Sequence, residues 1–267
     1  MANSLSPIIF LSGAGGETPS FETFNVGDGD NVKFETVTYP SWTQYALKEF
    51  TPEALIADLE AKIISKVPHG PIRIVGYSLG GHFGYATALR LRAAGREIAG
   101  FCAIDSFMIE SLGPSAGWRA RALSEGLDLL RKGHLHELSR FARSKFWRAV
   151  LRLSPPQVPR LFGQFCSFER LSPIVAFDRV LETELTLHLL IRKVAPWVQS
   201  LDRNPVALDA PATLLRTRQN SQYDEVWRRR CPTIKIIEIS GQHTKLFSSE
   251  NIVALREAVV AATRDQH

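Results

Sequence analysis

The feature that most constrains this chain is the turn at 76–81, which reads Gly-Tyr-Ser-Leu-Gly-Gly. An apolar run at 72–75 precedes the turn and a stretch with helical spacing follows it, which predicts a strand, a tight turn and a helix. A serine on such a turn takes a strained backbone conformation, and side chains in place of Gly76 and Gly80 would collide. The helix that starts beneath Ser78 presents free N–H groups and a positive dipole end, which stabilise negative charge. This arrangement predicts that Ser78 is a nucleophile.

Strand and helix patterns alternate along most of the chain. Apolar or alternating runs predict five further strands, at 7–11, 32–39, 98–104, 213–217 and 233–239. Helical patterns with short connections lie between most of them, which predicts a mostly parallel sheet covered by helices on both faces. Ligand sites in such sheets lie outside the carboxyl ends of the strands. The small-residue loop at 13–16, Ser78 and Asp105 all follow predicted strands directly.

The segment 109–198 interrupts this alternation with helical patterns alone. We expect one domain over 1–267 that carries this segment as a helical insertion, a lid over the strand ends. Basic residues clearly outnumber acidic ones in the insertion. The excess fits either a solvated helix face or a docking surface for an acidic partner. The aromatic residues there fit a lid core better than a base-stacking platform.

Composition excludes several classes of protein. No apolar run approaches the length of a membrane span. The first residues lack the charged segment of a signal peptide, which predicts a cytoplasmic protein. The net charge of +5 does not demand nucleic acid as a partner. Cys102, Cys166 and Cys231 are odd in number and lack metal-ligand spacing, so we expect reduced thiols and no metal site.

A nucleophilic serine needs a histidine base, and His243 is the best placed of the seven histidines. It alone follows a late predicted strand in a loop, behind Gly241, where it can reach Ser78. His82 lies instead in the first turn of the helix after the nucleophile. In α/β-hydrolases the chain order is nucleophile, acid, histidine, which is the order available here. We therefore expect an α/β-hydrolase fold with His243 as the general base.

Two aspartates can supply the acid that orients the histidine. Asp105 directly ends an apolar run, as a buried acceptor would. Asp224 follows the 213–217 strand by several residues and can instead begin a short helix. Position alone leaves both open.

The oxyanion hole needs two backbone N–H donors aimed at the developing charge. We expect the first from Leu79, the residue after the nucleophile. For the second, the loop at 13–16 supplies small residues that allow a close approach of the backbone, and Ala14 is the preferred donor. The same glycines also fit an ordinary turn.

At this point the chain resembles the thioesterase domains that release products from non-ribosomal peptide and polyketide synthases. The segments that carry the resemblance are Ser-Gly-Ala-Gly-Gly at 12–16, the 76–81 turn, Leu-Arg-Ala-Ala-Gly at 91–95, Ile-Asp-Ser at 104–106 and Gly-Gln-His at 241–243. The resemblance implies that Asp105 is the acid and that Ala14 carries the second oxyanion donor. The family usually has an aromatic residue after the histidine, where this chain has Thr244, so the packing there is expected to differ.

The resemblance also implies the reaction and its partners. An acyl chain would arrive as a thioester on the phosphopantetheine of an acyl or peptidyl carrier protein and pass to Ser78. Hydrolysis or macrocyclisation would then release it, without a metal or a redox cofactor. Two alternatives stay open: a general esterase or lipase of the same fold, and a non-catalytic hydrolase-like binding protein.

Overall fold

The structure, a computed structural model, describes residues 7–14, 32–39, 50–107, 124, 127–153, 190 and 192–264. The chain divides into two compact units. The first, here called the α/β unit, comprises Met1–Pro40, Phe50–Met108 and Pro196–His267. The second comprises Ser41–Glu49 and Ile109–Ala195. The described parts of each unit are considered separately.

A six-stranded sheet forms the centre of the α/β unit, and every neighbouring pair of its strands is parallel. The strands are β1 (Ile8–Leu11), β2 (Phe34–Val37), β3 (Ile72–Tyr77), β4 (Ile98–Ile104), β5 (Ala212–Thr217) and β6 (Lys235–Ile239). Their spatial order is β2-β1-β3-β4-β5-β6, so β3 and β4 lie at the middle of the sheet. The predicted parallel α/β fold is confirmed, and each strand overlaps the run that predicted it.

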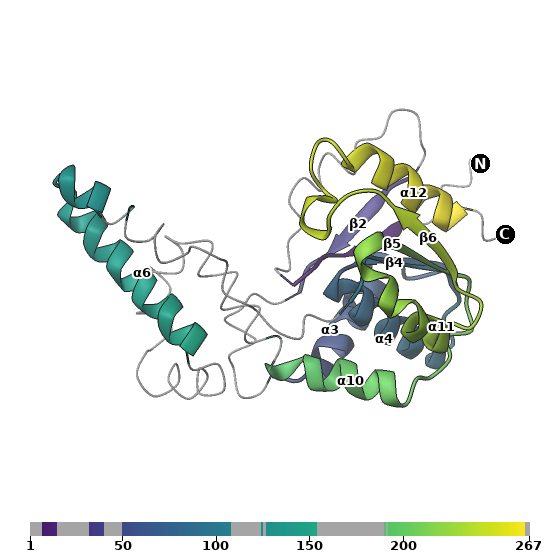
Figure 1. The fold of residues 1–267 in the computed structure, drawn as a ribbon. Coiled ribbons are helices and arrows are strands. Elements are labelled where there is room, and N and C mark those ends of the chain that lie inside the picture. Colours follow the sequence, from purple (N-terminus) through teal and green to yellow (C-terminus); the bar gives the residue numbers. More distant parts are fainter. Residues whose placement is uncertain are drawn as a thin grey trace. The chain divides into compact units, whose positions relative to one another are not determined.

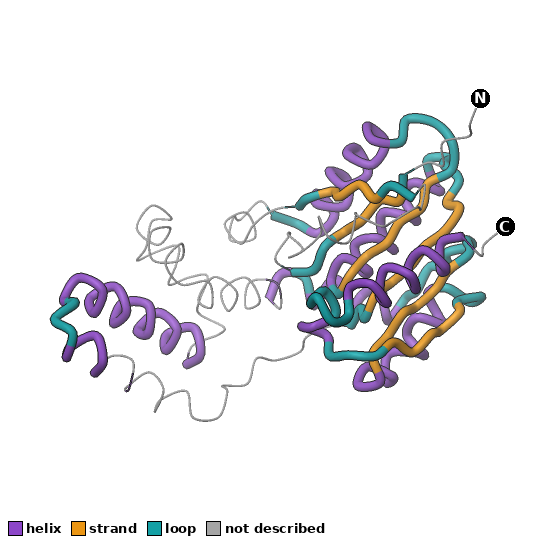
Figure 2. Tube along the Cα trace, turned by 90° about the horizontal axis from the view of Figure 1, so that it is seen from above, coloured by secondary structure: helices purple, strands orange, loops and turns teal. Residues whose placement is uncertain are grey.

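Helices cover both faces of this sheet (Figures 1 and 2). They are α3 (Pro52–Lys66), α4 (Leu79–Ala93), α10 (Ala195–Arg203), α11 (Asp224–Arg230) and α12 (Ile252–Arg264). Helix α4 packs on β3 and β4 from one face, with α3 beside it, and α12 packs on β4 and β5 from the other face. Two 3₁₀ segments, Arg218–Tyr223 and His243–Lys245, follow β5 and β6.

The start of α3 shows why the sequence places a helix there. The Thr51 hydroxyl accepts a hydrogen bond from the Ala54 N–H at 3.1 Å, and Pro52 occupies the first helical position. The cap satisfies an N–H that has no partner within the helix, and the proline loses no hydrogen bond there. Leu55, Leu59 and other apolar residues then bury one face.

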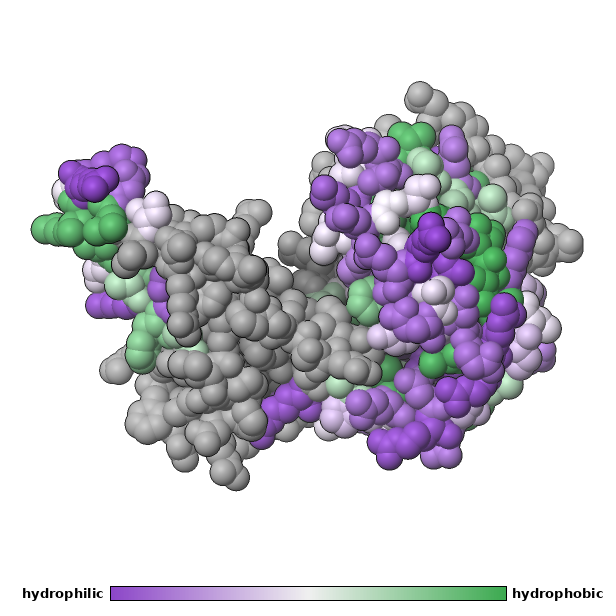
Figure 3. All heavy atoms as spheres, viewed as in Figure 1, coloured by the Kyte–Doolittle hydropathy of each residue, from purple (hydrophilic) through white to green (hydrophobic). Residues whose placement is uncertain are grey.

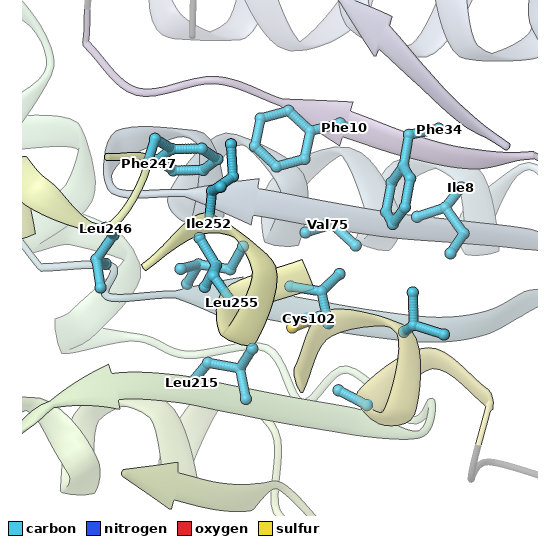
Figure 4. Packing of buried hydrophobic residues seen from close by; sticks show 14 residues of the cluster. Ile8, Phe10, Phe34, Val75, Cys102, Leu215, Leu246, Phe247, Ile252 and Leu255 are labelled. Carbon is cyan, nitrogen blue, oxygen red and sulfur yellow. The ribbon is translucent and has the colours of Figure 1, made fainter. Parts of the chain in front are cut away.

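The core between α12 and the sheet sits directly below the strand ends (Figure 4). Phe10, Val75 and Leu215 contribute from the strands, and Ile252 and Leu255 contribute from α12. All of these side chains are almost completely removed from water, and each such burial contributes about 1.5–3 kcal/mol. The thiol of Cys102 belongs to the same cluster, and burial raises its pKa. It is a free cysteine, as is the buried Cys231.

In the second unit the structure describes the helix α6 (Leu135–Leu153) and the residues just before it. Leu135 and Phe146 are exposed apolar side chains of α6. The face of the α/β unit seen in Figure 3 is mostly hydrophilic. Much of the helical insertion predicted at 109–198 lies outside the described residues. The role of this unit as a lid stays a prediction.

Candidate active site

Ser78 occupies the turn between β3 and α4 and has a positive φ of 53°. Residues other than glycine rarely adopt this backbone conformation, so the surrounding structure must enforce it. Glycines make the turn possible: a Cβ at Gly76 would lie 2.2 Å from the carbonyl oxygen of Gly80, and a Cβ at Gly80 would lie 2.4 Å from that of Ser12. The expected collisions are therefore found, and the turn has the geometry of a nucleophile elbow.

Asp105 lies beside the elbow because β3 and β4 are neighbours in register. Tyr77 pairs with Ile104, so the next residue of each strand, Ser78 and Asp105, leaves the sheet at the same edge. The Ser78 N–H donates to the carbonyl of Ile104 at 2.8 Å and holds the two turns together. Gly81 packs so tightly on Ser106 that a Cβ there would lie 1.9 Å from the Ser106 hydroxyl.

Asp105 is completely buried and has a positive φ of 44°, the second such non-glycine residue among those described. Its Oδ1 accepts hydrogen bonds from the backbone N–H and the hydroxyl of Thr217, at 2.7 and 2.9 Å. Its Oδ2 lies 2.8 Å from Nδ1 of His243. The aspartate is thus fixed by the end of β5 and aimed at the histidine that follows β6.

His243 starts the 3₁₀ segment after β6, and aromatic rings hold it from two sides. The Tyr77 ring stacks on the imidazole at 5.0 Å between centroids, and the Phe107 ring meets it edge-on at 4.6 Å. The Tyr77 hydroxyl also donates to the carbonyl of His243 at 2.7 Å. Phe247 packs against the Tyr77 ring at 4.9 Å. These rings surround the histidine in a chain where Thr244 replaces the aromatic residue usual in the family.

The pKa of Asp105 is lowered from its ordinary value of 3.8. Burial alone would raise this pKa, but the hydrogen bonds from His243, Asn220 and Thr217 to the carboxylate outweigh it. The pKa of Tyr77 is raised, first by burial and then by the negative charge of Asp105. The site therefore holds an ionised carboxylate next to a protonated phenol at neutral pH.

Of the two predicted oxyanion donors, Leu79 directly follows Ser78, and Ala14 belongs to the loop after β1. Leu79 is the first residue of α4, so its N–H has no partner within the helix. The loop after β1 passes beside the nucleophile, since a Cβ at Gly13 would lie 3.5 Å from Cβ of Ser78. Ala14 is the next residue of that loop.

The described contacts of Asp224, the alternative acid, do not include His243. It is the first residue of α11, and its carboxylate accepts from Nε of Arg216 at 3.0 Å. Arg216 also binds Glu238 on β6 at 2.7 Å. The Asp224 side chain is 24% exposed, so it belongs to a surface ion pair.

A buried arginine network lies behind the elbow, and the sequence analysis missed it. Arg230 of α11 is fully buried and donates to Nδ1 of His82 at 2.7 Å and to Asp202 at 2.6 Å. Its guanidinium lies 5.1 Å from the ring centres of both Tyr85 and Trp227. The available signal is the run of three arginines at the end of α11, a pattern that is equally typical of a solvated helix end.

The same network also contacts the residue that follows Asp105. The Trp227 indole donates to the carbonyl of Ser106 at 2.9 Å, one residue beyond Asp105. Burial lowers the pKa of His82 well below its ordinary value of 6.5, and the positive charge of Arg230 lowers it further. Burial likewise lowers the pKa of Arg230, against the opposing effect of Asp202.

Within the described part of the chain, no group of three His, Cys, Asp or Glu side chains could hold a metal ion. Its helices also include none that is both long and apolar enough to cross a membrane.

A parallel sheet whose central strand ends in a nucleophile elbow, with an aspartate and a histidine at the same edge, defines the α/β-hydrolase class. Within that class, the family model of the thioesterase domain matches residues 6–150, more than half of the 267. The chain belongs to the thioesterase domain family.

Two curated relatives align with part of the chain. The inactive atromentin synthetase invA4 of Paxillus involutus is 32% identical over 111 residues, 39% of this chain and 12% of that protein. The non-reducing polyketide synthase men2 of Menisporopsis theobromae is 33% identical over 111 residues, 40% of this chain and 5% of that protein. The chain thus corresponds to a small part of each of these much longer proteins.

Solved structures of similar fold cover nearly the whole chain. The NocB thioesterase domain, in covalent complex with a fluorophosphonate nocardicin G analog, covers 97% of this chain and 95% of its own, with 15% identity and a TM-score of 0.59. YbtT, a type II thioesterase from the yersiniabactin NRPS/PKS pathway, covers 100% and 96%, with 17% identity and a TM-score of 0.53. At such identities the likeness shows the fold.

Proposed function

We propose that this chain is a serine thioesterase that releases an acyl, peptidyl or polyketide chain from the phosphopantetheine of a carrier protein. The observation that carries the proposal is the Asp105–His243 hydrogen bond of 2.8 Å at the edge of the sheet where Ser78 occupies the elbow. Membership of the thioesterase domain family gives the reaction class. Similarity to part of a polyketide synthase supports a carrier-bound substrate.

In the proposed mechanism Asp105 holds the imidazole so that Nδ1 carries the proton and Nε2 can accept one. Ser78 Oγ attacks the thioester carbonyl while His243 Nε2 takes the hydroxyl proton. The N–H groups of Leu79 and Ala14 hold the oxyanion that forms. The imidazolium then protonates the departing phosphopantetheine thiol, and the acyl group remains on Ser78.

The second half of the reaction uses the same residues. His243 takes a proton from water, or from a hydroxyl or amine of the acyl chain itself. The activated oxygen or nitrogen attacks the ester on Ser78, and the proton returns to the serine. Water releases an acid, whereas an internal nucleophile closes a ring.

The lowered pKa of Asp105 supports this role. A carboxylate that stays ionised at neutral pH can both fix the tautomer of His243 and stabilise the imidazolium. Asp224 lacks this contact and pairs with Arg216 instead. We therefore assign the acid to Asp105.

The experiment that tests the proposal compares the parent protein with Ser78→Ala on an acyl-loaded carrier protein. Intact-mass measurement should detect an acyl adduct on the parent alone. Turnover of the variant should fall by about a thousandfold or more, because the nucleophile is removed while binding remains. An adduct on Ser78→Ala would rule out Ser78 as the nucleophile.

A second measurement separates a thioesterase from a general esterase of the same fold. Both would use the same three residues, so the substrates must distinguish them. The octanoyl thioester of N-acetylcysteamine and p-nitrophenyl octanoate present one acyl group on two leaving groups. A higher kcat/KM for the thioester is expected, and a clear preference for the nitrophenyl ester would favour the esterase.

A further inference from the structure

We propose that Tyr39 is a positioning residue that fixes the second oxyanion donor, the N–H of Ala14. The proposal rests on the proposed function, in which Ala14 has this role. Tyr39 lies 39 residues before Ser78 in the sequence, outside every motif described above.

The register of the sheet brings Tyr39 to the oxyanion loop. Strand β2 pairs in parallel with β1, and Val37 lies opposite Leu11 at the carboxyl end of both. Tyr39 and Gly13 each follow two residues later, so they leave the sheet side by side. An edge strand therefore delivers a tyrosine to the loop at the end of its neighbour.

The contacts of Tyr39 join this loop to the elbow helix. The Tyr39 side chain is buried, and its hydroxyl donates to the carbonyl oxygens of Ser12 and Gly13. Its ring packs edge-on against Phe83 of α4, with the centroids 5.3 Å apart. Helix α4 thus fixes the Tyr39 ring, and the hydrogen bonds of the Tyr39 hydroxyl fix the loop relative to this helix.

The planarity of the peptide group converts this contact into an orientation of Ala14. In a trans peptide the C=O and the following N–H point in opposite directions, and the described residues contain no cis peptide. The carbonyl of Gly13 and the N–H of Ala14 belong to one peptide group. A carbonyl held toward Tyr39 therefore turns the Ala14 N–H away from Tyr39.

The turned N–H lies in a loop that passes beside the nucleophile. A Cβ on Gly13 would be in van der Waals contact with Cβ of Ser78, at 3.5 Å. An oxyanion donor stabilises the transition state only if its direction is set before the reaction. Loops rich in small residues hold such a direction poorly by themselves. The Tyr39 hydroxyl supplies the missing constraint.

The test uses Tyr39→Phe, which removes the hydroxyl and keeps the ring against Phe83. A fluorophosphonate probe reports on the site without knowledge of the acyl chain, because its phosphoryl oxygen needs the same donors when Ser78 attacks. We expect the maximal labelling rate to fall about tenfold, short of the hundredfold or greater loss that follows removal of an oxyanion donor. The concentration of probe that gives half-maximal rate should stay unchanged.

The matched control is Tyr85→Phe. The Tyr85 hydroxyl also donates to a backbone carbonyl, that of Val206, away from the carboxyl ends of the strands. The same atom is lost from another buried tyrosine, so both variants should lose similar stability while Tyr85→Phe labels at the parental rate. The pH dependence of labelling should keep its shape in both, because neither change touches Asp105 or His243.

Three results would overturn the role of Tyr39, of which two concern the labelling rate. One is labelling of Tyr39→Phe at the parental rate, and the other is equal slowing of both variants, which would indicate general loosening. A shifted pH profile in Tyr39→Phe would also contradict it, because the variant would then act through the acid–base pair. Failure of the proposed function is distinct: the parent itself would then not be labelled at Ser78, or it would be labelled but prefer the nitrophenyl ester to the thioester.

Discussion

His243 and His82 belong to different elements, and their surroundings are similar in geometry. Nδ1 of His243 is 2.8 Å from a side-chain atom of Asp105, and Nδ1 of His82 is 2.7 Å from one of Arg230. Each ring also stacks on an aromatic neighbour, at 5.0 Å with an interplanar angle of 22° for His243 and at 5.5 Å and 23° for His82. The main difference is the charge of the partner.

That charge decides what each imidazole can do. A carboxylate accepts from Nδ1–H, so the proton of neutral His243 stays on Nδ1, and a positive ring would be stabilised. A guanidinium donates to Nδ1, so the proton of neutral His82 is on Nε2, and a positive ring is opposed by Arg230. The first arrangement suits a general base. The second suits a neutral acceptor at a fixed position. Without it, Nη1 of the buried Arg230 would lack this hydrogen-bond partner.

The largest effect is expected from Asp105→Asn, which replaces the carboxylate partner of His243 by an amide. The amide can still accept from Thr217 through its oxygen, but it then presents an NH₂ group to His243. The ring would adopt the tautomer with the proton on Nε2, as His82 already does. Turnover should fall on the order of a hundredfold at least, by the tautomer argument.

Urea denaturation supplies the control for Asp105→Asn, since its midpoint should show that the variant is folded under the assay conditions. A folded variant with near-parental turnover would contradict the assignment of Asp105 as the acid. Loss of turnover together with loss of folding would call for a ¹⁵N NMR measurement of the His243 tautomer in the folded fraction. The proton should be found on Nε2.

The opposite side of the comparison predicts an acid-sensitive fold. The pKa of His82 is lowered in the folded state, so unfolding takes up a proton wherever the pH is below the unfolded value of about 6.5. The contribution of the neutral ring is therefore fully present above pH 6.5 and is lost as the pH falls. Below about pH 6, the equilibrium constant for unfolding should rise up to tenfold per pH unit from this histidine alone, until the pH reaches the lowered pKa of the folded state.

His82→Gln removes this titration and keeps an acceptor for Arg230. Urea titrations at pH 7.5 and 5.0 should show that the variant loses less stability on acidification than the parent. His69→Gln, at an exposed histidine, should follow the parent. Because the pKa of Asp105 is lowered from 3.8, its own contribution is lost only below about pH 4, outside this window. Identical pH dependence in parent and His82→Gln would disprove the assignment.

The sequence predicts His243 and misses the role of His82 for a physical reason. The elbow, the strand pattern and the loop position of His243 are all local, so they can be read from neighbouring residues. The choice of Asp105 over Asp224 already needed a family resemblance, because each follows a strand. The hydrogen bond between His243 and Asp105 depends on the register of the sheet, which no single segment of the sequence specifies.

His82 depends on a longer-range contact. Its partner Arg230 lies 148 residues away, in a helix whose arginine-rich end resembles an ordinary solvated surface. Tyr39 is similar, since its reach to Gly13 follows from the pairing of β1 with β2. Pairing across a sheet and burial of a charge are set by the whole fold, and no local pattern in this sequence specifies them.

The smallest effect is expected from Asp224→Asn, which sharpens the comparison by removing a carboxylate of the same type from the start of α11, after the neighbouring strand β5. Asp224 pairs with Arg216 at 3.0 Å, in an ion pair whose side chains are 15% and 24% exposed. Such a pair contributes about 1 kcal/mol or less, and Arg216 keeps its second partner, Glu238.

Turnover of Asp224→Asn should therefore stay within about tenfold of the parent, and stability should fall by no more than about 1 kcal/mol. Turnover of both Asp224→Asn and Asp105→Asn, measured under the same conditions, distinguishes two explanations. The activity of His243 depends either on the hydrogen bond to its Nδ1 or on negative charge in general. A crippled Asp224→Asn with an active Asp105→Asn would move the acid to the start of α11, after β5. It would also mean that the 2.8 Å contact between Asp105 and His243 does not orient the base.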